Sequence, residues 1–187
     1  MRSLTNADWY LLRGSGVVAL ILFTLVFALG IATSKRWRLA RLPKFVTLGL
    51  HRNVSLLAVA FLGIHIATAM LDSYAHVGIA QVFLPTGASH YSVYLALGAL
   101  SFDLLLAVLV TSLLRERLTY RLWKSVHWLA YASWPIALAH TIGIGTDASS
   151  SWLRDVAVAC TALVGGTVAW RLIELRRPYP KYLGAAS

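Results

Sequence analysis

Five long stretches of the sequence are almost free of charge, and this feature limits the possible fold more than any other. A helix that crosses a membrane needs about 20 apolar residues, and each stretch reaches that length with its flanks. Within lipid the backbone must satisfy its own hydrogen bonds, which helices do and open strands do not. The sequence therefore predicts an all-α membrane protein, a single domain over residues 1–187 that forms a bundle of five transmembrane helices. The predicted helices cover residues 14–34, 46–71, 91–114, 122–145 and 152–173.

The composition excludes several soluble classes of protein. Hydrophobic residues make up 58% of the chain and charged residues only 13%, although the formal net charge is +10. A soluble nucleic-acid-binding protein combines basic charge with an otherwise polar surface, which this chain lacks. The single cysteine, Cys160, excludes an intrachain disulfide framework and a cysteine-cluster metal site.

The basic residues indicate how the bundle is oriented. Fourteen of the 17 Lys and Arg residues lie in or close to three segments, which are the one between the first and second spans, the one between the third and fourth, and the one after the fifth. Connecting segments rich in Lys and Arg lie on the cytoplasmic side of a membrane. We therefore expect a multi-pass protein of the cell membrane, with its N-terminus outside and its C-terminus in the cytoplasm.

Four of the six histidines lie inside two of the predicted spans. His51 and His65 are 14 residues apart in the second span, and His127 and His140 are 13 apart in the fourth. The predicted topology makes these helices parallel, so His51 shares a depth with His127, and His65 with His140. At 1.5 Å rise per residue the two depths differ by about 20 Å. Because imidazole is a standard axial ligand of haem iron, this arrangement predicts two stacked b-type haems.

The interval in the fourth span does not suit a straight helix. Fourteen residues return a side chain to within roughly 40° of its starting face, whereas thirteen leave it roughly 140° away. Pro135 lies between His127 and His140, and a proline inside a helix bends the axis. We therefore expect a bend at Pro135 to bring both histidines toward the same side.

The pattern His51-x13-His65 with His127-x12-His140 resembles that of the ferric reductase-like transmembrane domain superfamily. That superfamily includes ferric reductases, NADPH oxidases and the haem subunit of the bacterial methionine sulfoxide reductase system. Residues 9–16, 48–53 and 126–131 also resemble small actinobacterial members, and the resemblance covers nearly the whole chain. It implies that His51 with His127, and His65 with His140, hold the iron of two haem b groups.

The resemblance also implies a function in electron transfer. Electrons would pass from a cytoplasmic donor, expected to be a flavoprotein, through a bis-histidine dihaem cytochrome b to an external acceptor. The sequence has no Gly-rich dinucleotide fingerprint after a strand, so we expect the haem-bearing component of an oxidoreductase whose donor is another molecule. The alternative is a cofactor-free membrane protein, such as a transporter subunit or assembly factor, with histidines used for packing or protonation.

Three basic residues flank the histidines of the predicted cytoplasmic pair, and these are Arg52, Arg121 and Lys124. Haem propionates are carboxylates, which Arg and Lys bind through charge-assisted hydrogen bonds. We predict that the three residues bind propionates. The alternative is that they only anchor the helix ends on the cytoplasmic side.

Asp103 is an ionisable residue in the middle of the third predicted span. Such residues are rare in membranes and usually functional. We expect Asp103 either to carry protons or to form a hydrogen bond with a polar group such as Thr68 or Ser133. The remaining histidines, His76 and His90, are predicted to lie on the outside.

Three aromatic residues lie at depths between the two predicted pairs, and they are Phe61, Tyr131 and Trp134. These side chains could line the gap between two haems and assist electron transfer. Aromatic residues in a helix bundle more commonly serve packing alone.

Overall fold

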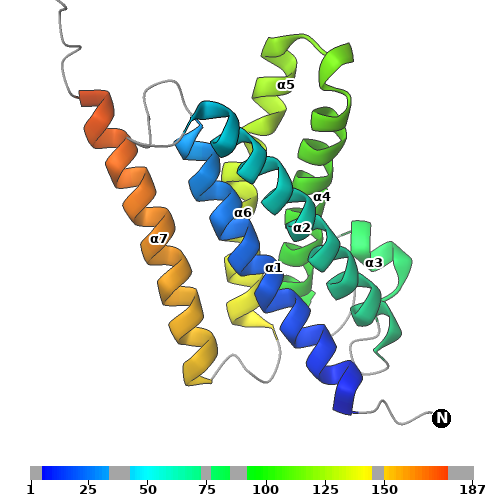
Figure 1. Cartoon of the computed structure of the whole chain (residues 1–187). Coiled ribbons are helices and arrows are strands. Elements are labelled where there is room, and N and C mark those ends of the chain that lie inside the picture. Colours follow the sequence, from blue (N-terminus) through cyan, green and yellow to red (C-terminus); the bar gives the residue numbers. More distant parts are fainter. Residues whose placement is uncertain (1–5, 34–42, 73–76, 85–91, 145–149, 177–187) are drawn as a thin grey trace, which may run out of the picture.

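The computed structural model describes residues 6–33, 43–72, 77–84, 92–144 and 150–176. The described part of the chain is a helical bundle without strands (Figure 1). Its helices are α1 (Asn6–Ala32), α2 (Lys44–Leu71), α3 (Ile79–Phe83), α4 (Ser92–Leu113), α5 (Tyr120–His127), α6 (Leu129–Gly143) and α7 (Ser151–Arg176), with a short 3-10 helix, η1 (Arg115–Arg117), before α5.

Four helices, α1, α2, α4 and α7, are long and apolar enough to cross a membrane. This result confirms the prediction of an all-helical membrane protein. The predicted span over residues 122–145 is instead two helices, α5 of eight residues and α6 of fifteen, which meet at Trp128. Each is shorter than the roughly 20 residues of a membrane-spanning helix. The five-span arrangement and the orientation of the termini therefore stay predictions.

Local sequence explains where two of these helices begin. Pro43 precedes α2, and its φ of −59° is compatible with the start of a helix. Proline has no backbone N–H, but at a helix start this group would have no partner within the helix. Thr119 precedes α5, and its side chain accepts a hydrogen bond from the Leu122 N–H at 3.4 Å. Such a cap satisfies one of the backbone donors that a helix start leaves open.

The helices pack in two groups that share α6. α1 packs along α2 and α7 and also contacts α6, whereas α4 packs against α6 and α3. A buried hydrophobic cluster joins α1, α6 and α7. It contains Leu20, Phe23, Phe27, Ile31, Trp134, Cys160 and Val164.

Polar side chains connect the helices inside this apolar bundle. Trp134 is 5% exposed, and its Nε1–H donates a hydrogen bond of 3.0 Å to Thr24 Oγ1 on α1. The Thr24 hydroxyl in turn donates to the Leu20 carbonyl at 2.8 Å. On the other side of α6, the Ser101 hydroxyl of α4 donates to the Ser133 carbonyl at 3.1 Å. These bonds hold α6 in a fixed position between α1 and α4.

We expect Trp134→Phe to lower the free energy of unfolding by about 1 kcal/mol, the usual size of a hydrogen bond between helices in a membrane protein. Denaturant titration of the detergent-purified protein, followed by circular dichroism, measures this change. Thr24→Val removes the same bond from the other side. The double variant should therefore lose less stability than the sum of the single variants, and simple additivity would contradict this account.

Candidate functional site

The helices form a large, partly open cavity, and most of its lining comes from α1, α2, α4, α5 and α6. Its volume is about 1640 Å³. An ordinary small-molecule pocket occupies about 300–1,000 Å³, so this cavity has room for more than one small ligand. The lining includes His51, His65, His127 and His140.

The four histidines face one another in two pairs. The ring centroids of His51 and His127 are 6.3 Å apart, with an angle of 64° between the ring planes. The ring centroids of His65 and His140 are also 6.3 Å apart, with an angle of 81°. Each pair takes one histidine from α2 and the other from α5 or α6. The structure thus brings together the same partners that the sequence analysis paired by depth.

The distance within each pair suits a single metal ion between the two rings. An imidazole nitrogen binds a metal at about 2.0 Å and its ring centre lies about 1.1 Å further away, so two imidazoles on opposite sides of one ion have centres about 6.2 Å apart. Both observed separations, 6.3 Å, agree with that value.

Backbone carbonyl groups orient both histidines of the His65–His140 pair. His65 Nδ1 lies 3.0 Å from the Leu12 carbonyl oxygen of α1, and His140 Nδ1 lies 2.7 Å from the Tyr94 carbonyl oxygen of α4. A carbonyl oxygen can only accept, so each Nδ1 carries the hydrogen and donates it. Each Nε2 therefore keeps its lone pair and is the atom available to a metal.

A glycine lies one helical turn beyond each of these two carbonyl groups. A Cβ atom on Gly16 would lie 2.8 Å from His65 Cε1, and one on Gly98 would lie 2.6 Å from His140 Cε1. Both distances are too short for real carbon contacts, so each ring rests directly on bare helix backbone. No sequence motif predicts a role for these glycines. Gly16 lies 14 residues before Gly30, and the two histidines of α2 are separated by the same interval. This match is the feature of the sequence that could have indicated Gly16.

The His51–His127 pair is held differently. Both Nδ1 atoms are buried and have no hydrogen-bond partner among the described residues, although His51 has a weaker interaction with the Val26 backbone. A Cβ atom on Gly30, one turn beyond Val26, would be 3.5 Å from His51 Cε1, which is an ordinary contact. His127 stacks on Trp123, with ring centroids 4.9 Å apart and an angle of 26°. Among the described residues, this pair therefore has only the weaker Val26 interaction at His51 where the other pair has two carbonyl hydrogen bonds.

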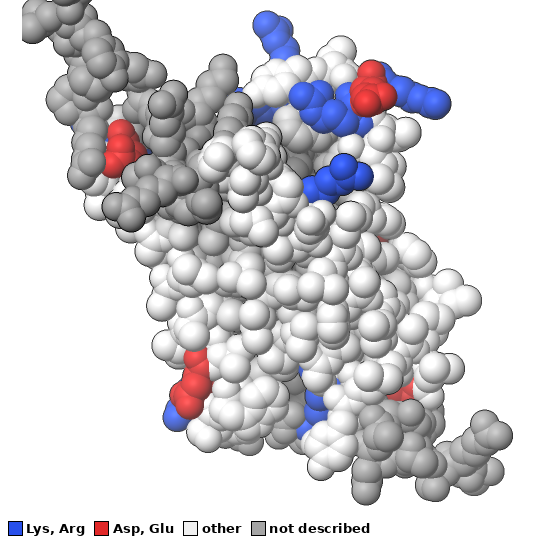
Figure 2. All heavy atoms as spheres, viewed as in Figure 1, with Lys and Arg blue, Asp and Glu red and all other residues white. Residues whose placement is uncertain are grey.

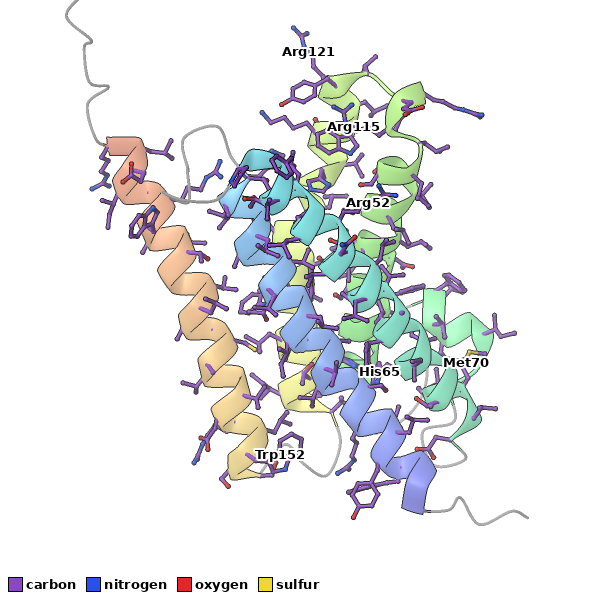
Figure 3. All side chains as sticks on the ribbon, in the orientation of Figure 1. Arg52, His65, Met70, Arg115, Arg121 and Trp152 are labelled. Carbon is purple, nitrogen blue, oxygen red and sulfur yellow. The ribbon has the colours of Figure 1, made fainter. Side chains whose placement is uncertain are left out.

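Basic side chains gather near the His51–His127 pair, at a position that we call the basic end (Figure 2). Arg52 and Arg115 line the cavity there, and the Arg115 guanidinium carbon lies 4.3 Å from the centroid of the Trp123 ring. Arg121 and Lys124 are not among the residues that line the cavity, and Arg121 projects away from the end of α5 (Figure 3). The basic end comprises Arg52, Arg115, Arg117, Arg121 and Lys124. His65 lies toward the opposite end of the bundle (Figure 3).

The aromatic residues predicted to lie between the pairs occupy different surroundings. Trp134 belongs to the buried cluster and, like Phe61, is not among the cavity-lining residues. Tyr131 does line the cavity, and so do Phe23 and Phe27 of α1. The Phe27 and Tyr131 rings meet edge to face, with centroids 4.9 Å apart. The aromatic side chains on the cavity wall therefore come from both α1 and α6.

Neither hydrogen bond suggested for Asp103 is observed. The Thr68 hydroxyl donates to the carbonyls of Ile64 and His65, and the Ser133 hydroxyl donates to the Ala130 carbonyl. Asp103 is half-buried on α4 and is not among the cavity-lining residues. His76 and His90 lie outside the described residues.

A helix irregularity between His127 and His140 lies at Trp128, where α5 and α6 meet, and the expected bend at Pro135 stays a prediction. The Tyr131 N–H bonds to the Trp128 carbonyl at 3.0 Å, three residues back, while α6 continues through Pro135. A bond across three residues tightens the helix and turns it further per residue. His127 and His140 are 13 residues apart, yet both face α2. The irregularity at Trp128 lies within this interval.

The family model described as "Ferric reductase like transmembrane component" matches residues 15–143, a range that contains all four paired histidines. The chain belongs to the ferric reductase-like transmembrane family. Membership indicates electron transfer across a membrane, and domains of this family generally bind haem and usually work with cytoplasmic redox domains. No curated protein and no solved structure matches the chain.

The site fits the haem that ferric reductase-like domains generally bind. Within the described residues, no group of three or more His, Cys, Asp or Glu side chains could hold a metal ion. Two imidazoles hold iron firmly when a porphyrin supplies the other ligands, as in haem proteins with two axial side chains. The large cavity and the two separate histidine pairs suit such a group better than a bare ion.

Proposed function

We propose that this chain is a dihaem cytochrome b that passes electrons across the cell membrane. His51 and His127 would bind the iron of one haem b, and His65 and His140 the iron of the other. The observation that carries this proposal is the pair of equal ring separations, 6.3 Å each, on the wall of one cavity. When bound, haem supplies one-electron redox chemistry, while the protein supplies ligands, orientation and burial.

The residues around each pair would hold the haems by charge and by exclusion of water. Arg52, Arg121 and Lys124 stay our predicted partners for propionates at the basic end, since Arg and Lys bind carboxylates strongly. Arg52 has the best support because it lines the cavity. Arg115, which the sequence analysis did not name, lines the cavity beside it and joins this set. Tyr131 and Phe27 would exclude water between the two pairs.

The proposed direction of electron flow follows from the distribution of charge. The positive-inside rule puts the basic end in the cytoplasm, the N-terminus outside and the C-terminus inside. A cytoplasmic donor, which we propose is a flavoprotein, would be oxidised near His51 and His127. An external acceptor would be reduced near His65 and His140, one electron at a time. The surplus of Lys and Arg at the basic end suits a negatively charged donor.

We expect the protein, purified in detergent from haem-replete cells, to contain about two haems per chain with the spectrum of six-coordinate iron. Oxidised and dithionite-reduced absorption spectra, combined with a haem assay and a protein assay, measure this content. A preparation without haem absorbance would overturn the proposal and favour the cofactor-free alternative.

A further inference from the structure

We propose that two copies of this chain form a two-fold symmetric dimer in the membrane. The interface would be the outward face of α4, where the Asp103 carboxyl groups of the two copies would hydrogen-bond to each other. The inference goes beyond the proposed function and does not depend on haem. Two observations carry it. The first is the position of Asp103 in the bundle, and the second is the pattern of side chains on the same face of α4.

Asp103 is an ionisable residue at the middle of a helix that is apolar enough to cross a membrane. Its side chain is half-buried, does not line the cavity, and has no hydrogen bond or ion pair among the described residues. Carboxyl groups at the centre of a bilayer are costly, and they usually pair with one another or with other polar groups. The isolated position of Asp103 therefore favours a partner from outside the bundle.

The face of α4 that carries Asp103 points away from the interior of the bundle. The interior contacts of α4 come from Gly98, which packs on His140, and from Ser101, which donates to the Ser133 carbonyl. At 3.6 residues per turn, Gly98 and Ser101 lie roughly 140° and 160° around the helix from Asp103. Asp103 therefore lies on the side that would face lipid or a neighbouring protein.

The side chains above and below Asp103 form a regular seam along this face. Successive members are alternately three and four residues apart, which is the spacing of side chains that pack one helix along another. Three members are exposed and three are half-buried, and none lines the cavity. All but Asp103 are apolar. The seam comprises Val93, Ala96, Leu100, Asp103, Ala107 and Val110.

A second copy of this chain is the partner that fits the seam best. A two-fold axis along the membrane normal puts the α4 helices of both copies side by side at the same depth, so that Asp103 meets Asp103. A protonated carboxyl group both donates and accepts, so two of them satisfy each other. The small side chains of Ala96 and Ala107 allow the helices to approach closely. A different protein would need its own polar residue at this depth, whereas a second copy has one by symmetry.

The residues that directly follow α4 carry charges of both signs. In η1, Glu116 lies between Arg115 and Arg117, and all three side chains are exposed. A two-fold axis would bring the η1 segments of the two copies toward each other. Glu116 would then offset part of the repulsion between the two basic ends.

The first test detects the contact by cross-linking. Leu100 in the seam and Leu163 on α7 are a matched pair, because each is 41% exposed. Each is changed to Cys in a chain with Cys160→Ala, since Cys160 is the only cysteine of the sequence. In vesicles with lipid in large excess, treated with copper phenanthroline, we expect Leu100→Cys to form a disulfide-linked dimer and Leu163→Cys to stay monomeric. Absence of the dimer, or equal cross-linking of both variants, would overturn the proposal.

The second test changes the carboxyl group. Energy transfer between labelled chains, at a series of protein-to-lipid ratios, gives the dissociation constant of the dimer. We expect Asp103→Leu to weaken the dimer about tenfold, which corresponds to the loss of two hydrogen bonds between membrane helices. Asp103→Asn should dimerise nearly as tightly as the parent, because a carboxamide also donates and accepts. A dissociation constant that Asp103→Leu leaves unchanged would show that the inference is wrong.

Haem content, measured in every variant, keeps this inference separate from the proposed function. Asp103→Leu and Leu100→Cys should contain as much haem as the parent, because the seam faces away from the cavity. A dimer without haem would support the inference and overturn only the proposed function. A monomer with two haems would do the reverse. The cross-linking experiment leaves Asp103 in place, so it decides the matter even if Asp103→Leu does not fold.

Discussion

Chains that carry both His51→Ala and His140→Ala should contain no haem, whereas chains with His51→Ala and His127→Ala should keep about one. The first combination takes one ligand from each facing pair, and the second removes both ligands from a single pair. The choice of pairs follows the proposed function, in which the histidines whose rings are 6.3 Å apart would share an iron. A haem assay per mole of purified chain, for all six double variants, measures the outcome.

The pattern across the double variants separates pairing from general damage. Only the His51/His127 and His65/His140 combinations should retain haem, while the four mixed combinations should retain none. Gly14→Ala should retain both haems, since that position is open. Retention of haem in a mixed combination would show that the ligands are paired in some other way.

Single histidine variants should block electron transfer across a membrane completely even though each keeps one haem. The two pairs are separated by roughly 20 Å along α2, given 14 residues at 1.5 Å each. An electron would have to cross that distance in one step if either site were lost. In vesicles with trapped ferricyanide and external reductant, we expect His51→Ala and His65→Ala to reduce the trapped acceptor no faster than protein-free vesicles.

Two comparisons make this vesicle experiment decisive. Trp134→Phe should transfer electrons at the rate of the parent protein, because Trp134 is buried in the α1–α6–α7 cluster and is not among the cavity-lining residues. Haem content is measured in the same vesicles, so a slow rate cannot be attributed to poor reconstitution. Normal transfer by His65→Ala would contradict a path that needs both pairs.

Hydropathy was enough to predict the long helices but not their ends. The span predicted over residues 152–173 corresponds to α7 (Ser151–Arg176), and the span over 46–71 to α2 (Lys44–Leu71). α1 begins at Asn6, eight residues before the predicted start at residue 14. The prediction stopped at Arg13 because charge is costly in lipid, whereas a helix continues beyond the membrane at little cost. That extra segment contains Leu12, whose carbonyl oxygen orients His65.

The histidine partners could be predicted from the sequence because they depend on depth alone, which follows from counting residues along parallel helices. The features that set their chemical surroundings depend on contacts between helices. Neither a glycine nor a proline is next to Trp128 in the sequence, so no local pattern indicates that α5 ends there. The roles of Gly16 and Gly98 follow from the approach of α2 and α6, which no local pattern contains.

The origin of each facing pair has a consequence for biosynthesis. One histidine of each pair lies on α2, and the other lies on α5 or α6, more than sixty residues later in the chain. A ribosome makes α2 first, so no pair exists while only the first half of the protein has entered the membrane. In the proposed function, haem insertion is therefore a late step, which would follow synthesis of the segment through His140. A truncated product that ends before α5 would carry two histidines without partners, and cells could not load it with cofactor.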